Sequence, residues 1–136
     1  MPLVIPNVQE VEVLTNRLTP ALTMRLYGNN VTPTGATTAA AFTEIAGGGY
    51  ANKPLIFANW NISAGDPSIA VYNASQVWTF TGVIDAPGTI YGYYITRDSD
   101  GLLILAERFP AGVIPFSPIA GSVVNVLPRY SAQSQF

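Results

Sequence analysis

The chain has 136 residues, of which 49% are hydrophobic and only 10% are charged, and its net charge at pH 7 is −2. It contains no histidine and no cysteine, which excludes disulfides, thiolate nucleophiles and most zinc or iron sites. The six basic residues are scattered and the apolar runs are short, which argues against nucleic-acid binding and against a membrane span. We therefore expect a single domain, residues 1–136, with no cofactor, no nucleic-acid partner and no membrane segment.

Residues 1–20 are predicted to form an N-terminal arm followed by a helix. Prolines at positions 2 and 6 favour an extended backbone at the start of the chain. The spacing of apolar residues predicts a helix over Asn7–Leu18, in which Asn7 and Glu10 could form a capping box. Several β-branched residues in this stretch leave a strand as the alternative. The helix would direct inward Val8, Val11, Leu14 and Leu18, and outward Glu10, Asn16 and Arg17.

A half-buried strand is predicted over Leu22–Tyr27, because Leu22, Met24 and Leu26 alternate with residues that tolerate solvent. The tract that follows, residues 31–49, is rich in polar and small residues. One or two helical turns are expected there over Thr37–Ile45. A loop of this length within a compact domain is usually a functional loop or a contact arm.

Turn signals then separate several short strands, predicted over Pro54–Asn61, Ser68–Tyr72, Gln76–Val83, a central pair, and Ser122–Leu127. Residues 110–121 are expected to be an apolar loop packed against a surface. Residues 128–136 are expected to be a mobile tail, or an arm that reaches a neighbour. The pattern predicts a mostly β fold, an antiparallel β-sandwich or jelly-roll-like domain with one short N-terminal helix.

The central pair lies in residues 89–110 and is predicted to be a hairpin around the turn Asp98–Gly101. A loop of two or four residues would pair Ile95 with Ile104, Tyr94 with Leu105, Tyr91 with Arg108 and Ile90 with Phe109. Both faces of this hairpin are apolar, although a sheet packed on one side only should alternate apolar with polar residues. Either another layer of the same chain or another molecule must therefore cover the second face. Together with the low charge, this favours a subunit of an assembly.

Few residues suggest chemistry. The carboxylates of Glu44, Asp66, Asp85 and Glu107 are isolated in the sequence, so no acid pair for glycoside hydrolysis is predicted and the chain is not expected to be an enzyme. Arg108 is expected to lie over the Tyr91 ring as a cation–π contact. Asp98-x-Asp100 is expected to be a hairpin turn, since the ligands of a full calcium loop are missing. Aromatic residues that could stack on a sugar are Trp60, Trp78, Tyr91, Tyr93 and Tyr94, which keeps a carbohydrate-binding module as an alternative.

Three stretches carry a resemblance to a known class of proteins: VIPNVQEVEVL, TMRLYGNNVTPTGATTAAAFTEI with Tyr50 after it, and IYGYYITRDSDGLLILAERF. They resemble small structural proteins of tailed bacteriophages, among them capsid decoration (cement) proteins. The resemblance implies a β-rich homotrimer on the outer capsid surface of the virion, made in the host cytoplasm. A tail or fibre-base structural subunit is the alternative within the same class.

On this hypothesis the protein self-associates and clamps neighbouring major capsid subunits, or another virion protein, through its loops and termini. Besides the two chain ends, we expect partner contact from two loops. One contains Gly47, Gly48, Gly49 and Tyr50, where the glycines favour a hinge or a close backbone approach. The other contains Val113, Ile114 and Phe116.

Overall fold

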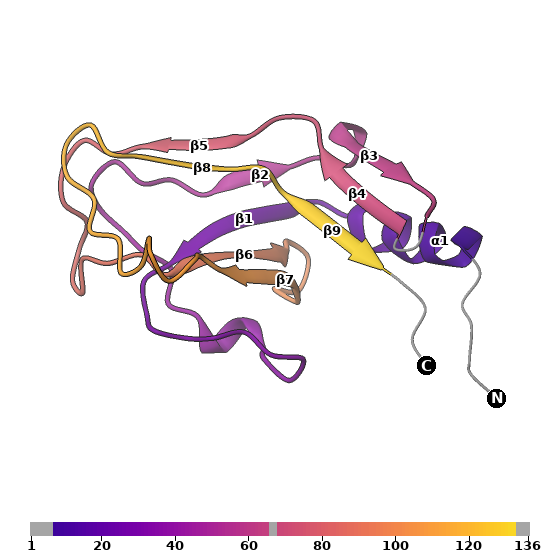
Figure 1. Ribbon diagram of the computed structural model, residues 1–136, viewed down its shortest axis with the longest axis horizontal. Helices are drawn as coiled ribbons and strands as arrows, with labels where there is room; N and C mark the ends of the chain where they lie inside the picture. The colour runs from indigo at the N-terminus through magenta and orange to yellow at the C-terminus, as the bar shows by residue number, and fades with distance from the viewer. Residues whose placement is uncertain (1–6, 66–67, 133–136) are drawn as a thin grey trace.

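The computed structural model describes residues 7–65 and 68–132, and it confirms a mostly β fold with one short helix (Figure 1). The helix α1 spans Asn7–Leu18. The described strands are β1 Leu22–Tyr27, β2 Lys53–Leu55, β3 Trp60–Ser63, β4 Ser68–Tyr72, β5 Gln76–Thr79, β6 Gly92–Arg97, β7 Leu103–Arg108, β8 Val123–Val126 and β9 Arg129–Ala132. All pairings between them are antiparallel, in a four-stranded sheet β2-β1-β6-β7, a three-stranded sheet β3-β4-β9 and a two-stranded ribbon β5-β8. The finer jelly-roll connectivity stays a prediction.

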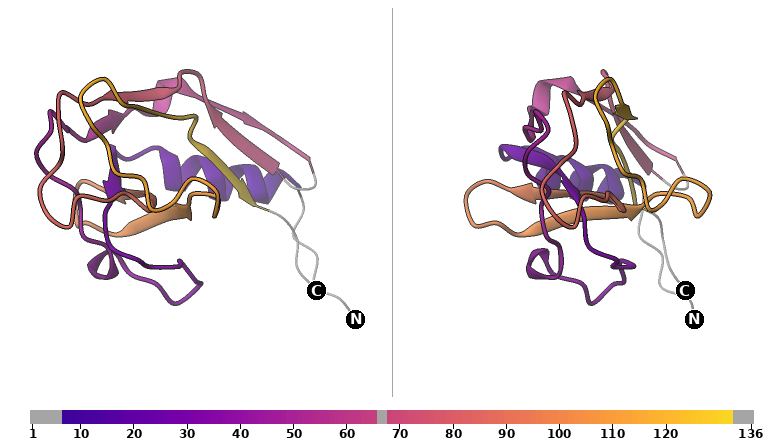
Figure 2. Two further views of the ribbon diagram at one scale, coloured as in Figure 1. Left: turned by 60° about the vertical axis from the view of Figure 1, so that its left-hand side comes forward. Right: turned by 90° about the vertical axis from the view of Figure 1, so that its left-hand side faces the viewer.

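The helix has the predicted bounds but not the predicted buried face. It packs against β3, β4 and β9, and it lies below β3 and β4 in the views of Figure 2. Leu14 and Leu18 are buried as expected, whereas Val8 is 73% exposed. Glu10, which we expected on the outer face, is only 2% exposed and accepts a hydrogen bond from the Ser68 hydroxyl at 2.9 Å. The partner in β4 explains the error, because a buried carboxylate needs a hydrogen-bond donor that helical periodicity does not reveal.

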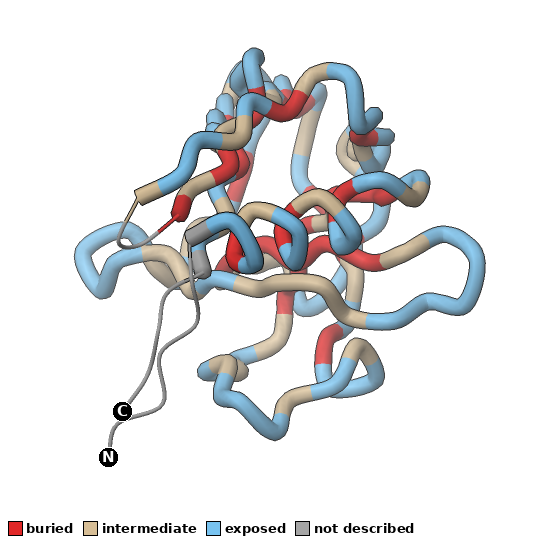
Figure 3. The backbone as a smooth tube through the Cα atoms, turned by 90° about the vertical axis from the view of Figure 1, so that its right-hand side faces the viewer, coloured by how far each residue is buried: buried red, intermediate tan, exposed pale blue. Residues whose placement is uncertain are grey.

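Strand β1 lies at the centre of the four-stranded sheet, between β2 and β6. One face of this sheet packs into the main core, which the helix, the ribbon β5-β8 and strands β3 and β4 complete. The other face carries a second cluster formed by Tyr27, Phe42 and Tyr94, with the Phe42 and Tyr94 rings stacked 4.8 Å apart. Figure 3 shows that the buried residues gather toward the middle of the fold, while the outer loops are mostly exposed.

The second face of the central hairpin is therefore covered by the chain's own residues 31–45, which run beneath β6 and β7 in Figure 1. Phe42 is the side chain that closes this face, and a single turn of 3-10 helix, Ala39–Ala41, precedes it. Sequence alone left open whether the same chain or another molecule provided this cover. Since the same chain does, the apolar hairpin no longer argues for a partner.

The hairpin has the expected four-residue loop Asp98–Gly101, in which Gly101 adopts φ +72°. Thr96 pairs with Leu103 as predicted, but a bulge next to it shifts every later pair by one residue. Ile95 lies opposite Leu105 instead of Ile104, and Tyr94 lies opposite Ala106 instead of Leu105. A one-residue shift moves side chains between faces, so the predicted pairing was wrong beyond the turn.

Three predicted elements need correction. The single strand predicted over Pro54–Asn61 is two strands, β2 and β3, in different sheets, because the 3-10 turn Phe57–Asn59 separates them. Strand β5 ends at Thr79, short of the predicted Val83. The tail predicted to be mobile from residue 128 begins with strand β9, which pairs with β4. Residues 133–136 and the arm before Asn7 lie outside the described residues.

Candidate interaction surface

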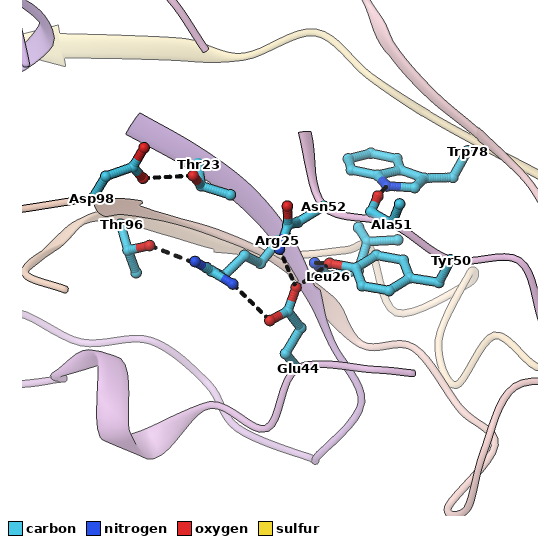
Figure 4. Close-up of polar contacts among 10 residues, drawn as sticks. All are labelled: Thr23, Arg25, Leu26, Glu44, Tyr50, Ala51, Asn52, Trp78, Thr96 and Asp98. Carbon is cyan, nitrogen blue, oxygen red and sulfur yellow. Dashed lines mark hydrogen bonds and ion pairs between the residues drawn. The ribbon is translucent and has the colours of Figure 1, made fainter. Parts of the chain in front are cut away.

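A polar network centred on Glu44 ties the loop 31–50 to the middle of β1 (Figure 4). Arg25 and Glu44 form an ion pair at 2.7 Å, and the Arg25 Nε–H donates to the Thr96 hydroxyl at 3.1 Å. The second Glu44 oxygen accepts a hydrogen bond from the Tyr50 hydroxyl at 2.7 Å. The ion pair was not predicted, because Glu44 was considered only as a member of an acid pair and Arg25 comes from a distant part of the chain.

Tyr50, a predicted contact residue, is half-buried inside this network. Its hydroxyl donates to Glu44 and accepts the backbone N–H of Leu26 at 3.1 Å. Burial, together with the bond to the Glu44 carboxylate, raises the pKa of the Tyr50 phenol far above its ordinary value. The phenol therefore stays neutral at any physiological pH. Its hydrogen bonds hold the loop against β1, and a phenol that stays neutral is not suited to proton transfer.

The three glycines before Tyr50 also face their own chain. Gly47, Gly48 and Gly49 all adopt positive φ, between 62° and 82°, which other residues rarely adopt. A Cβ atom on Gly47 would collide with the Asp85 carboxylate. The Gly48 carbonyl accepts the backbone N–H of Thr81 at 2.9 Å. The close approach predicted from the glycines is thus an approach to residues 81–85 of the same chain.

The other predicted contact loop lies at an open surface. Val113 and Phe116 line an apolar groove of about 280 Å³, together with Phe109, Pro110, Val123, Val124 and Asn125. Val113 is 51% exposed and Val123 is 53% exposed. Ile114 is half-buried and is not part of the groove lining. The groove carries no charged side chain, so its chemistry suits an apolar ligand surface.

Strand β8 supplies one wall of the groove, and sequence analysis missed its contribution. The pairing of Val77 with Asn125 and Thr79 with Val123 places these four side chains on one face of the ribbon. Val77 is 42% exposed on this face, beside the exposed Val123. The alternation in Val123–Val126 could have shown which valines face outward, but not that loop 109–116 would run beside them. We call the groove and the outward face of β5-β8 the ribbon surface.

The remaining candidate residues have structural roles. The Arg108 guanidinium lies 5.2 Å from the Tyr91 ring centroid, which confirms the predicted cation–π contact. Glu107 lies opposite Tyr93 and accepts its hydroxyl hydrogen bond at 2.9 Å. Asp100 pairs with Arg97 at 2.6 Å across the hairpin turn.

The aromatic residues considered for sugar stacking do not form an exposed platform. Trp60, Trp78, Tyr93 and Tyr94 are each 6% exposed or less. Trp78 is fixed in place by donating its indole N–H to the Ala51 carbonyl at 2.8 Å. The fifth candidate, Tyr91, is half-buried under Arg108. The geometry that motivated a carbohydrate-binding module is therefore missing.

Within residues 7–65 and 68–132, no group of three or more His, Cys, Asp or Glu side chains is arranged to hold a metal ion. In the same part of the chain, no helix has the length and apolar character needed to cross a bilayer. Comparison of the chain with protein-family models, with curated proteins and with solved structures finds no match. The ribbon surface and the resemblance in the sequence are therefore the two features that bear on function.

Proposed function

We propose that this chain is a structural virion protein of a tailed bacteriophage, a capsid decoration protein that self-associates and clamps neighbouring major capsid subunits. The observation that carries the proposal is the uncharged groove between loop 109–116 and β8, with exposed valines beside it. Exposed apolar patches on small proteins mark sites of contact with other molecules. The resemblance of the sequence to small virion proteins supplies the kind of partner.

The free energy of burying this apolar surface favours a protein that binds its neighbours and holds them together. Apolar surface contributes roughly 25 cal/mol for each Å² removed from water, so covering the ribbon surface favours association. A partner that binds only the folded, assembled shell stabilises that shell by mass action. With only 10% charged residues, the chain brings few charges into the interface that would have to lose their hydration.

The polar groups described above support contact over catalysis. The carboxylates of Glu44, Glu107 and Asp100 all bind side chains of their own chain. The Glu10 carboxylate is buried against Ser68. An acid or base in a reaction needs room to reach a substrate, and these four groups are engaged in holding loops and strands together.

Sedimentation with virus particles tests the proposal. The full chain should sediment with intact particles in a density gradient, at a fixed ratio to the major capsid protein. Val113→Asp should reduce the bound fraction at least about tenfold, because it places a carboxylate in the groove. Val8→Asp, at an apolar position on α1 that is more exposed than Val113, is the control and should bind as the unmodified chain does. A chain that never sediments with particles would contradict the proposal.

The same particles decide between positions in the virion. Gold-labelled antibody against the chain should decorate the heads. Labelling restricted to tails would replace the capsid assignment with the tail or fibre-base subunit, while leaving the contact role in place.

A further inference from the structure

Among residues 7–65 and 68–132, one edge of β8 has backbone groups without a strand partner. Residues of an antiparallel strand alternate between those that bond to the neighbour and those that point away from it. The Phe80 N–H donates to the Ser122 carbonyl at 2.8 Å and the Phe80 carbonyl accepts from the Gly121 N–H at 2.8 Å, so both backbone groups of Phe80 point toward the chain that leads into β8. Trp78 with Val124 and Gln76 with Val126 follow in the same phase.

Val123 and Asn125 are out of phase with those pairs, so their N–H and C=O groups point away from β5. The same alternation continues just after β5, where the Thr81 N–H points the other way and donates to the Gly48 carbonyl. Among the described residues, Val123 and Asn125 have no backbone partner outside the ribbon. Such an edge is a template for another strand.

The groove lies along this edge. Three consecutive β8 residues, Val123 to Asn125, form one wall, and Phe109, Val113 and Phe116 stand opposite. A strand added to β8 would therefore enter the groove, with its backbone bonded to the edge and alternate side chains in contact with apolar walls. This is the mode in which extended peptides bind sheet edges, with backbone bonds for affinity and pockets for selectivity.

The sequence of the chain contains a segment that fits this site. Residues 1–6, MPLVIP, lie outside the described residues, carry no charged side chain and contain three large aliphatic residues. The two prolines fall at positions 2 and 6, in one phase with Val4. Leu3 and Ile5, in the other phase, keep their N–H groups, so one edge of the segment can pair fully while the other cannot. The segment can thus join one sheet edge without extending the sheet further.

If residues 1–6 occupy the groove, they must come from another copy of the chain. In Figure 1, α1 and β1 follow each other along the long axis of the molecule, with α1 at one end. They span about 18 Å for the helix and about 20 Å for the strand. The groove lies at the far end of β1, because its Phe116 pairs with Ile90, next to the β6 end that faces Tyr27. Six extended residues reach at most about 20 Å, too short to return to the groove of their own chain.

We propose that residues 1–6 of one copy bind as an added strand along the β8 edge of a neighbouring copy, with apolar side chains in the 109–116 groove. The proposal deepens the proposed function, since it names a second copy as the partner of the ribbon surface. Self-association would then proceed by exchange of arms from molecule to molecule.

Variants of the full chain test the two halves of the contact separately. The arm variant is Leu3→Asp with Ile5→Asp. The edge variant is Asn125→Pro, which removes one outward N–H and leaves the β5 pairing in place. The groove variant is Val113→Asp, which tests the same site in case the proline disturbs folding. Val8→Asp is the matched control. Sedimentation velocity should show that the unmodified chain and the control self-associate, and that the other variants do so at least about tenfold more weakly.

Mixing provides the sharper result. The arm variant keeps an intact groove and the groove variant keeps an intact arm, so an equimolar mixture should form one-to-one pairs although neither variant associates alone. Backbone hydrogen exchange gives an independent readout: the Val123 and Asn125 amides should be protected in the unmodified chain and exposed in the arm variant. The Val124 and Val126 amides, bonded to β5, should be protected in both.

A monomeric unmodified chain would overturn arm exchange, as would self-association that survives both the arm and the groove variants. An unmodified chain that associates while its Val123 and Asn125 amides exchange freely would do the same. None of these results depends on whether the chain sediments with virus particles, which is a separate measurement. Failure of arm exchange is therefore distinguishable from failure of the virion role.

Discussion

The two sides of this molecule use their apolar residues differently. Around β1, both faces of the sheet are covered and the polar side chains of Arg25, Glu44 and Tyr50 bind one another. At the ribbon β5-β8, the described residues leave one face and one strand edge uncovered, and Val123 and Val113 are more than half exposed. The comparison separates apolar residues that the fold itself requires from those that it leaves available. Low charge alone does not make that distinction.

The largest effect should come from the covered side. Tyr27→Ala removes a fully buried ring that contacts Phe42 at 4.7 Å between centroids. We expect a loss of about 3–5 kcal/mol in the free energy of unfolding, measured with urea, because a cavity of this size does not collapse fully. Val83→Ala, at a position 73% exposed, should change the value by less than about 0.5 kcal/mol. Equal effects of the two changes would contradict the division into covered and open sides.

Breaking the polar network should have an intermediate effect. Glu44→Gln leaves the Arg25 guanidinium without its carboxylate and weakens the bond from Tyr50. We expect a loss of about 1–3 kcal/mol, toward the lower end because both side chains of the ion pair are about a quarter exposed to solvent. Asp85→Asn is the matched control, since Asp85 is exposed, and should change stability little. If the network did not stabilise the fold, Glu44→Gln and Asp85→Asn would change the free energy of unfolding equally little.

A smaller effect is expected from pH at the hairpin turn. The bonds from the Arg97 guanidinium and from the Leu102 N–H lower the pKa of Asp100 to about 2. Because the folded state holds this pKa below its unfolded value of 3.8, the stabilisation is complete above about pH 4 and is lost as the pH falls toward 2. Asp100→Asn should remove this part of the pH dependence in urea titrations. An unchanged profile would mean that the ion pair does not persist in solution.

The smallest effect on stability should come from the ribbon surface. Val123→Thr and Val113→Ser change exposed side chains. The free energy of unfolding, measured by heating at a concentration where the chain is monomeric, should therefore change by less than about 0.5 kcal/mol. Loss of more than 2 kcal/mol in either variant would show that these valines belong to the core and would leave the groove without a free surface.

Local patterns predicted local structure well. The helix Asn7–Leu18 and the strands Leu22–Tyr27 and Ser68–Tyr72 have the bounds expected from periodicity and turn residues. The bulge beside Thr96 and the turn Phe57–Asn59 are local features that alternation did not reveal. The errors at the polar residues depend on partners far apart in the chain. Glu10 is buried because Ser68 bonds to it, and Glu44 is paired because β1 presents Arg25. Neither partner can be found by counting along the sequence.

The candidate surface was predicted in part for the same reason. An apolar loop at Val113–Phe116 was recognisable from composition, and its two ends, Val113 and Phe116, line the groove. The opposite wall required knowing that β8 is an edge strand, which follows from sheet order and not from the residues of β8. The glycines and Tyr50 were recognised as unusual, but their contacts are with residues 81–85 and with Glu44. Whether they also contact a partner stays a prediction.

The central position of β1 has a consequence for how the chain folds during synthesis. Leu22 pairs with Arg97 and Met24 with Ile95, so β1 leaves the ribosome long before the strand that completes it exists. The β6-β7 hairpin can form from neighbouring residues, whereas closing the sheet over such a long loop is slow. Until β6 has been synthesised, β1 is an unpaired apolar strand in the growing chain and is prone to aggregate. Chaperone dependence during expression should therefore be greatest for nascent chains that end before residue 97.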